Sequence, residues 1–117
     1  MTEGSVPLGY TEWRLVELSG ETVEIAEGER APHLALDLEE SRVAGSGGVN
    51  RIMGTFVLAE DELRFGPLAT TMMAGPEAAM ARERVFLDAL ATVTSYALDG
   101  SSLTLLADGT PVARLTA

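Results

Sequence analysis

The chain has 117 residues, of which 46% are hydrophobic and 22% are charged, a balance that supports one domain with its own apolar core. Eight basic and eighteen acidic residues give a formal net charge of −10, which disfavours binding to nucleic acid and to anionic lipid surfaces. The sequence contains no cysteine, which excludes disulfides, thiol catalysis and thiolate metal sites.

Residues 1–10 predict a flexible N-terminal arm, and residues 11–117 predict a single domain. The arm contains three residues that interrupt regular structure, Gly4, Pro7 and Gly9. It lacks the basic start and apolar stretch of a signal peptide, and no run of the chain approaches the ~18 apolar residues of a membrane-spanning helix. We expect a cytoplasmic protein without membrane contact; a secreted form whose leader has been removed would have the same features.

Short apolar runs predict a series of strands in the first half of the domain. Leu34, Leu36 and Leu38 alternate with residues that face the other way, which is the two-residue period of a half-buried strand. Gly54, inside another run, indicates a bulge or a close approach of two backbones. The predicted strands are 13–18, 23–25, 34–39, 42–44, 51–58 and 63–65, followed by a short extended segment at 69–73.

Residues 76–91 predict the one helix of the chain, because Pro76 suits the first helical position and Glu77 complements the positive end of the helix dipole. Three strands follow at 93–98, 103–106 and 112–115. The turns between them are predicted at Asp99-Gly100 and Asp108-Gly109, which are strong hairpin signals. The fold class is therefore mainly β, α+β by content. We expect a small antiparallel curved sheet or barrel of about eight strands, with the helix packed against it.

One acidic residue lies in the apolar face of the predicted helix. On a helical wheel, Glu83 falls between Ala79 and Phe86. Burying an unpaired carboxylate is costly, and an arginine fork can bind both carboxylate oxygens. We predict that Arg51 or, as second choice, Arg64 pairs with Glu83 and locks the helix to the glycine-rich turn. The alternatives are a catalytic acid and a tilted helix that leaves Glu83 in water.

The polar motifs predict structure more readily than chemistry. The glycine-rich run at 45–48 indicates a turn, since a phosphate cradle would need a following helix and the chain has no lysine. Asn50 should bond backbone groups of this turn or of segment 69–73. The serines lack a nucleophile motif, the only histidine, His33, lies far from Glu83 in sequence, and metal-ligand spacing is absent. We predict no catalytic, cofactor-binding or metal-binding residues.

Four methionines leave two interpretations open. Met53, Met72, Met73 and Met80 either fill gaps in the core or line a soft apolar pocket.

The motif residues together resemble a known family. Gly48, Asn50 and Gly54 form a G-x-N-x-x-x-G pattern, and Thr71 opens a T-x-M-A step before the helix. With further matches at Trp13, Arg51, Glu83 and Phe86, residues 11–117 resemble the META domain, the HslJ-like family of bacterial heat-shock-associated proteins.

This resemblance implies a small barrel-like fold with one helix and no established catalytic activity. Relatives usually carry cysteines where this chain has Val49 and Gly75, which fits a pair that could bridge in secreted relatives and is not needed in a reducing compartment. Relatives are associated with stress, antibiotic resistance, secretion or motility. We therefore read the matching residues as structural and expect a non-enzymatic interaction or stress-related module that acts through a protein partner or self-association. The alternative is a small apolar-ligand carrier that uses the barrel mouth.

Overall fold

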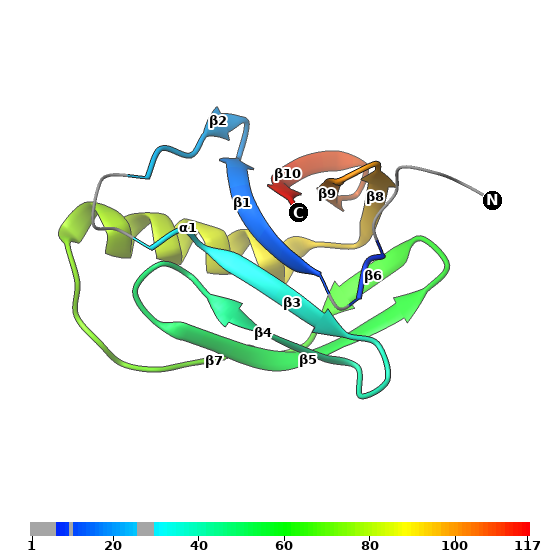
Figure 1. The fold of residues 1–117 in the computed structure, drawn as a ribbon, viewed down its shortest axis with the longest axis horizontal. Helices are drawn as coiled ribbons and strands as arrows, with labels where there is room; N and C mark the ends of the chain where they lie inside the picture. The colour runs from blue at the N-terminus through cyan, green and yellow to red at the C-terminus, as the bar shows by residue number, and fades with distance from the viewer. Residues whose placement is uncertain (1–6, 10, 26–29) are drawn as a thin grey trace.

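The computed structural model describes residues 7–9, 11–25 and 30–117, and these form a mainly β structure with one helix (Figure 1). The strands are β1 Glu12–Leu18, β2 Glu21–Thr22, β3 His33–Asp37, β4 Arg42–Ser46, β5 Arg51–Ala59, β6 Glu62–Phe65, β7 Ala69–Thr70, β8 Ser95–Asp99, β9 Ser102–Ala107 and β10 Thr110–Thr116, and the helix is α1 Glu77–Thr92.

Eight of the strands close into an antiparallel barrel. They are hydrogen-bonded in the order β10, β9, β8, β6, β5, β4, β3 and β1, and β1 pairs back onto β10. Two short strands lie off this path, β2 on β1 and β7 on β5. Closure pairs the strand edges that an open sheet would expose, and it confirms the predicted fold class.

The turns follow the local chemistry of the sequence. Asp108 and Gly109 have φ values of 50° and 86° and form the two-residue loop between β9 and β10, as predicted. The other predicted hairpin is shifted by one residue. Asp99 pairs with Ser102, so the loop consists of the two residues between them and Asp99 ends its strand.

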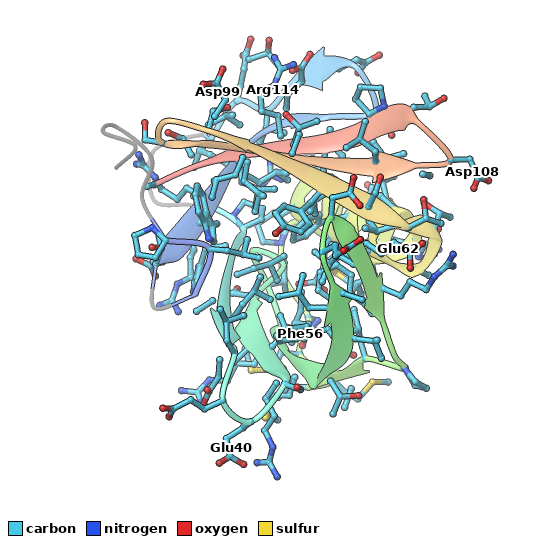
Figure 2. All side chains as sticks on the ribbon, turned by 90° about the vertical axis from the view of Figure 1, so that its right-hand side faces the viewer. Glu40, Phe56, Glu62, Asp99, Asp108 and Arg114 are labelled. Atoms are coloured by element: carbon cyan, nitrogen blue, oxygen red, sulfur yellow. The ribbon has the colours of Figure 1, made fainter. Side chains whose placement is uncertain are left out.

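Apolar side chains fill the barrel. Trp13, Ile52, Leu63 and Phe86 are completely buried, and Figure 2 shows Phe56 on the barrel wall while acidic side chains project from the hairpin ends. Helix α1 packs against β6 and β10 and contributes Phe86 to this core.

Two glycines in the strands allow close contacts between backbones. A Cβ atom on Gly54 would lie 3.0 Å from the carbonyl oxygen of Pro67, which confirms the predicted close approach. A Cβ on Gly45 would meet the carbonyl oxygen of His33 at 2.0 Å, so no side chain fits between β3 and β4 there.

Part of the expected N-terminal arm packs against the barrel. Leu8 is buried in the core, and the indole Nε1 of Trp13 donates a hydrogen bond to the Leu8 carbonyl at 2.9 Å. Residues 1–6 and 10 of the expected arm lie outside the described residues. Sequence periodicity missed Leu8 because it stands alone between Pro7 and Gly9.

Most element boundaries differ from the predicted ones by one to three residues, and the second strand and the helix are two examples. The second strand lies at 21–22 instead of 23–25, although the Val23 amide still donates to the Val16 carbonyl at 2.9 Å. The helix runs from 77 to 92 instead of 76 to 91, because Pro76 has extended dihedral angles and precedes the first helical residue. Within the described ranges, no helix is long and apolar enough to cross a bilayer.

Candidate functional site

Glu83 is buried under helix α1, with only 6% of its surface exposed. Its Oε2 atom accepts hydrogen bonds from the backbone amides of Val49 at 3.0 Å and Asn50 at 2.6 Å. Its Oε1 atom accepts a bond from the Asn50 side-chain Nδ2 at 2.8 Å. The carboxylate therefore joins the helix to the turn between β4 and β5, and the alternative in which it reaches water is wrong.

The predicted arginine partner is also wrong. Arg51 and Arg64 are both exposed, and in the described part of the chain no arginine forms an ion pair with Glu83. The physical reason is that the turn offers its own backbone N–H groups, and a buried carboxylate is stabilised by such donors as well as by a cation.

Asn50 connects Glu83 to the loop between β7 and α1. Its Oδ1 atom accepts bonds from the Thr71 hydroxyl at 2.9 Å and from the Met73 amide at 2.6 Å. Its Nδ2 atom donates to the Met73 carbonyl at 3.3 Å as well as to Glu83. The Thr71 hydroxyl oxygen in turn accepts from the Arg51 amide at 3.0 Å.

We call Glu83, Asn50, Thr71 and the backbone of Met73 the Asn50 network. Asn50 bonds segment 69–73 as expected, and both polar atoms of its side chain make two hydrogen bonds each. Such saturated networks fix the geometry of the segments that they join. Figure 1 shows that the β4–β5 turn and the loop leading into α1 meet at the same end of the barrel.

The glycine-rich turn is shaped to admit the carboxylate. A Cβ atom on Gly47 would lie 2.3 Å from the Glu83 Cγ, and Gly48 has a φ of 108°, which L side chains rarely adopt. The Ser46 hydroxyl closes the turn by accepting from the Gly48 amide at 3.0 Å. Since Glu83 already binds the amides of Val49 and Asn50, the turn resembles a cradle whose anion is a side chain of the same protein.

We predict that Gly47→Ala lowers the free energy of unfolding by about 2 kcal/mol, because the new methyl group overlaps the Glu83 side chain. Urea denaturation of the purified protein measures the change. In a Glu83→Ala background the same substitution should cost less than roughly 0.5 kcal/mol, since the clash is gone. Equal costs in the two backgrounds would show that Gly47 is required for another reason.

A surface hollow of about 410 Å³ lies beside the Asn50 network, between helix α1 and the loop that precedes it. Met72 and Met73 are 95% and 57% exposed, and Met80 is 37% exposed. These three thioether side chains line the hollow, and Arg84 and Asp88 also contribute to its lining. The exposed methionines therefore share this end with the charged side chains of Arg84 and Asp88, and Asn50, Thr71 and Glu83 of the Asn50 network also line the hollow.

The predicted methionine pocket is formed in part, because Met72, Met73 and Met80 line one hollow. Met53 is 52% exposed on β5 and lines a different hollow. All four side chains are exposed, so the interpretation that they fill gaps in the core is wrong. Methionine occurs both in protein cores and on exposed strands and loops. The sequence pattern therefore did not show that these methionines are exposed.

The lone histidine, His33, lies on β3 and is not part of the Asn50 network. His33 Nε2 is 3.5 Å from the Glu12 Oε2. Among the described residues, no three His, Asp or Glu side chains gather in the arrangement of metal ligands.

One contact in the site was missed at the sequence level, the close approach of Gly47 to Glu83, since the glycine-rich run predicted only a turn. Met80 was expected to line a pocket with Met72 and Met73, and it extends the exposed thioether surface beside them.

Comparison with known proteins gives a consistent family and fold. The family profile described as the META domain matches residues 6–117. A solved NMR structure of a protein from Burkholderia xenovorans is similar with a TM-score of 0.72 and 23% identity, covering 99% of this chain and 94% of that chain. A crystal structure of a DUF4847 family protein from Bacteroides vulgatus is similar with a TM-score of 0.68 and 14% identity, covering 93% of each chain. No curated protein gave a significant match. At these identities, the structural likenesses establish the fold alone.

Proposed function

The chain belongs to the META domain family, and from that premise we propose that it is a non-enzymatic interaction module whose Met72 and Met73 bind an apolar segment of a protein partner. The observation that carries the proposal is the pair of hydrogen bonds between the Asn50 side chain and the Met73 backbone. One side chain bonds both the amide and the carbonyl of that residue, so the loop is fixed where its neighbour Met72 is 95% exposed.

An exposed methionine keeps apolar surface in water, and burying such a side chain against a partner stabilises the complex by about 1.5–3 kcal/mol. Here two adjacent methionines face solvent from a loop that a buried network holds in place. Thioether side chains are flexible and polarisable and adapt to varied apolar surfaces. Because the loop backbone is already held in place, it loses less conformational entropy when a partner binds. The flexible methionine side chains can still adapt to partner surfaces of different shape.

The Asn50 network supports a binding role over catalysis. Glu83 accepts three hydrogen bonds from the turn and from Asn50, and Thr71 is held by two further bonds. These groups position a loop, whereas a general acid or base must reach a substrate atom. We include a stress-related role in the proposal, as the resemblance to heat-shock-associated relatives implies.

The proposal predicts site-specific crosslinking. A photoreactive amino acid placed at position 72 should capture one protein from the source cells, with more adduct after heat stress. The matched control is position 57 on β5, where Val57 is 68% exposed but lies outside the methionine-lined hollow.

Competition makes this test specific. Excess unmodified protein should suppress the position 72 adduct, while a Met72→Asp, Met73→Asp double variant should not, and circular dichroism should confirm that the variant is folded. Identical adducts from positions 72 and 57, or equal competition by the double variant, would contradict the proposal. A crosslinked dimer of this chain would identify the partner as a second copy.

A further inference from the structure

A second hollow, on the outer face of the barrel, has a cationic wall. Strand register places Arg14 beside His33, His33 beside Ser46, and Ser46 beside Arg51, so these residues form one row across β1, β3, β4 and β5. Directly paired residues of neighbouring strands project to the same face of a sheet. Arg30 joins the row from the segment before β3 and lines the same hollow as His33 and Arg51. We call this the outer hollow.

The floor of the outer hollow is made of small residues. It has a volume of about 430 Å³, and Ala35, Ala44 and Gly45 lie beneath the cationic wall. The register explains the shape, because Ala35 pairs with Ala44 and Ala44 pairs with Met53 in the row next to the cations. Short side chains in the middle of a sheet leave room above them, and Met53 adds an apolar side wall.

Neither of the two arginines, Arg30 and Arg51, forms an ion pair with a described residue, although acidic residues outnumber basic ones by eighteen to eight. Among the described residues that line the hollow, Glu12 is the one acidic side chain, and its Oε2 lies 3.5 Å from His33 Nε2. Two guanidinium groups with free donors thus face one hollow on an otherwise acidic protein.

From this arrangement we propose that the outer hollow binds a small organic carboxylate. The guanidinium groups of Arg30 and Arg51 bind the carboxylate oxygens, for which their planar forks are suited. The apolar body of the ligand lies over the alanine floor and against Met53. The volume falls within the range of small-molecule sites, roughly 300–1,000 Å³. This hollow shares no lining residue with the methionine-lined hollow.

Titration of the ¹⁵N-labelled protein with benzoate, followed by NMR, tests the proposal. Benzoate should produce saturable shifts at the amides of Ala35, Ala44 and Gly45, and its affinity should fall with added salt because the cations are exposed. Benzamide, which has the same shape without the charge, should produce no saturable shift. Inorganic phosphate, which has the charge without the apolar body, should bind at least tenfold more weakly than benzoate.

Variants identify the groups responsible. Arg51→Gln should weaken benzoate binding at least about tenfold, which corresponds to the loss of one charge-assisted hydrogen bond. The matched control is Arg42→Gln, which removes an exposed arginine of β4 that does not line the outer hollow and should leave the affinity unchanged. Equal binding of benzamide, phosphate binding as tight as benzoate, or unchanged affinity in a folded Arg51→Gln variant would overturn the proposal.

Discussion

Replacing Glu83 with alanine is expected to lower the free energy of unfolding by about 3 kcal/mol, because it leaves buried donors without acceptors. The backbone amides of Val49 and Asn50 and the side chain of Asn50 all donate to this carboxylate. Each unsatisfied buried group costs about 1–3 kcal/mol, and water entering from the adjacent hollow will recover part of that loss. Urea denaturation followed by circular dichroism measures the difference.

Comparing Glu83→Gln with Glu83→Ala separates the contribution of the hydrogen bonds to stability from that of the negative charge. Glu83→Gln keeps an oxygen for the two backbone amides but presents an NH₂ group to the Asn50 NH₂ group, so about 1–2 kcal/mol should be lost. The control is Asp88→Ala, since Asp88 is an exposed carboxylate on the same helix, and its cost should stay within roughly 0.5 kcal/mol. If Glu83→Ala and Asp88→Ala cost the same, Glu83 does not hold the turn.

The same series links stability to the proposed binding surface. Asn50 can hold Met73 only while its own orientation is fixed, and Glu83 is one of the groups that fix it. We therefore expect Glu83→Ala to speed hydrogen exchange at the Met73 amide more than at amides within β9.

The positions of the strands along this chain can largely be predicted from its sequence, because alternation and turn chemistry are local signals. Leu34 and Leu36 mark a strand by period two, and Asp108-Gly109 marks a hairpin by its need for positive φ. Barrel closure is not local. It depends on β1 pairing with β10 at the far end of the chain, and the resemblance to a family indicated it more directly than any pattern did.

The site could be predicted in part. The apolar face of the helix predicted that Glu83 is buried, and the turn-forming habit of asparagine predicted that Asn50 bonds segment 69–73. The arginine partner was wrong because charge pairing can be guessed from composition, whereas free backbone amides appear only once a turn has its three-dimensional shape. The exposure of Met72 escaped prediction for a similar reason, since it depends on where a loop is tied down.

An engineered disulfide between positions 49 and 75 is expected to give the largest gain in stability. A Cβ atom built on Gly75 lies 3.6 Å from the Cβ of Val49, which is within the 3.5–4.5 Å range of native disulfides. Gly75 does not have a positive φ, so a side chain is compatible with its backbone. Closing the loop from residue 49 to residue 75 should raise the free energy of unfolding by about 3 kcal/mol, or roughly 10 °C in Tm.

The Val49→Cys, Gly75→Cys variant provides its own control, because its oxidised and reduced forms differ only in the bond. Mass spectrometry should show the loss of two hydrogens after mild oxidation, and urea denaturation of both forms should give the difference in stability. The single variant Val49→Cys should be unaffected by the same oxidation. Oxidised and reduced forms of equal stability would mean that the bond strains the native backbone, and failure to oxidise would mean that the two positions are farther apart.

The bridge would also test what the Asn50 network does in this chain. Val49 donates to Glu83 through its amide, and Gly75 ends the loop that Asn50 holds, so a disulfide would tie the same two segments covalently. In the oxidised variant, Glu83→Ala should therefore cost less than in the parent, because the loop no longer depends on hydrogen bonds alone to remain in place. If the two costs are equal, the network stabilises the turn itself, and the loop with Met72 is positioned by other contacts.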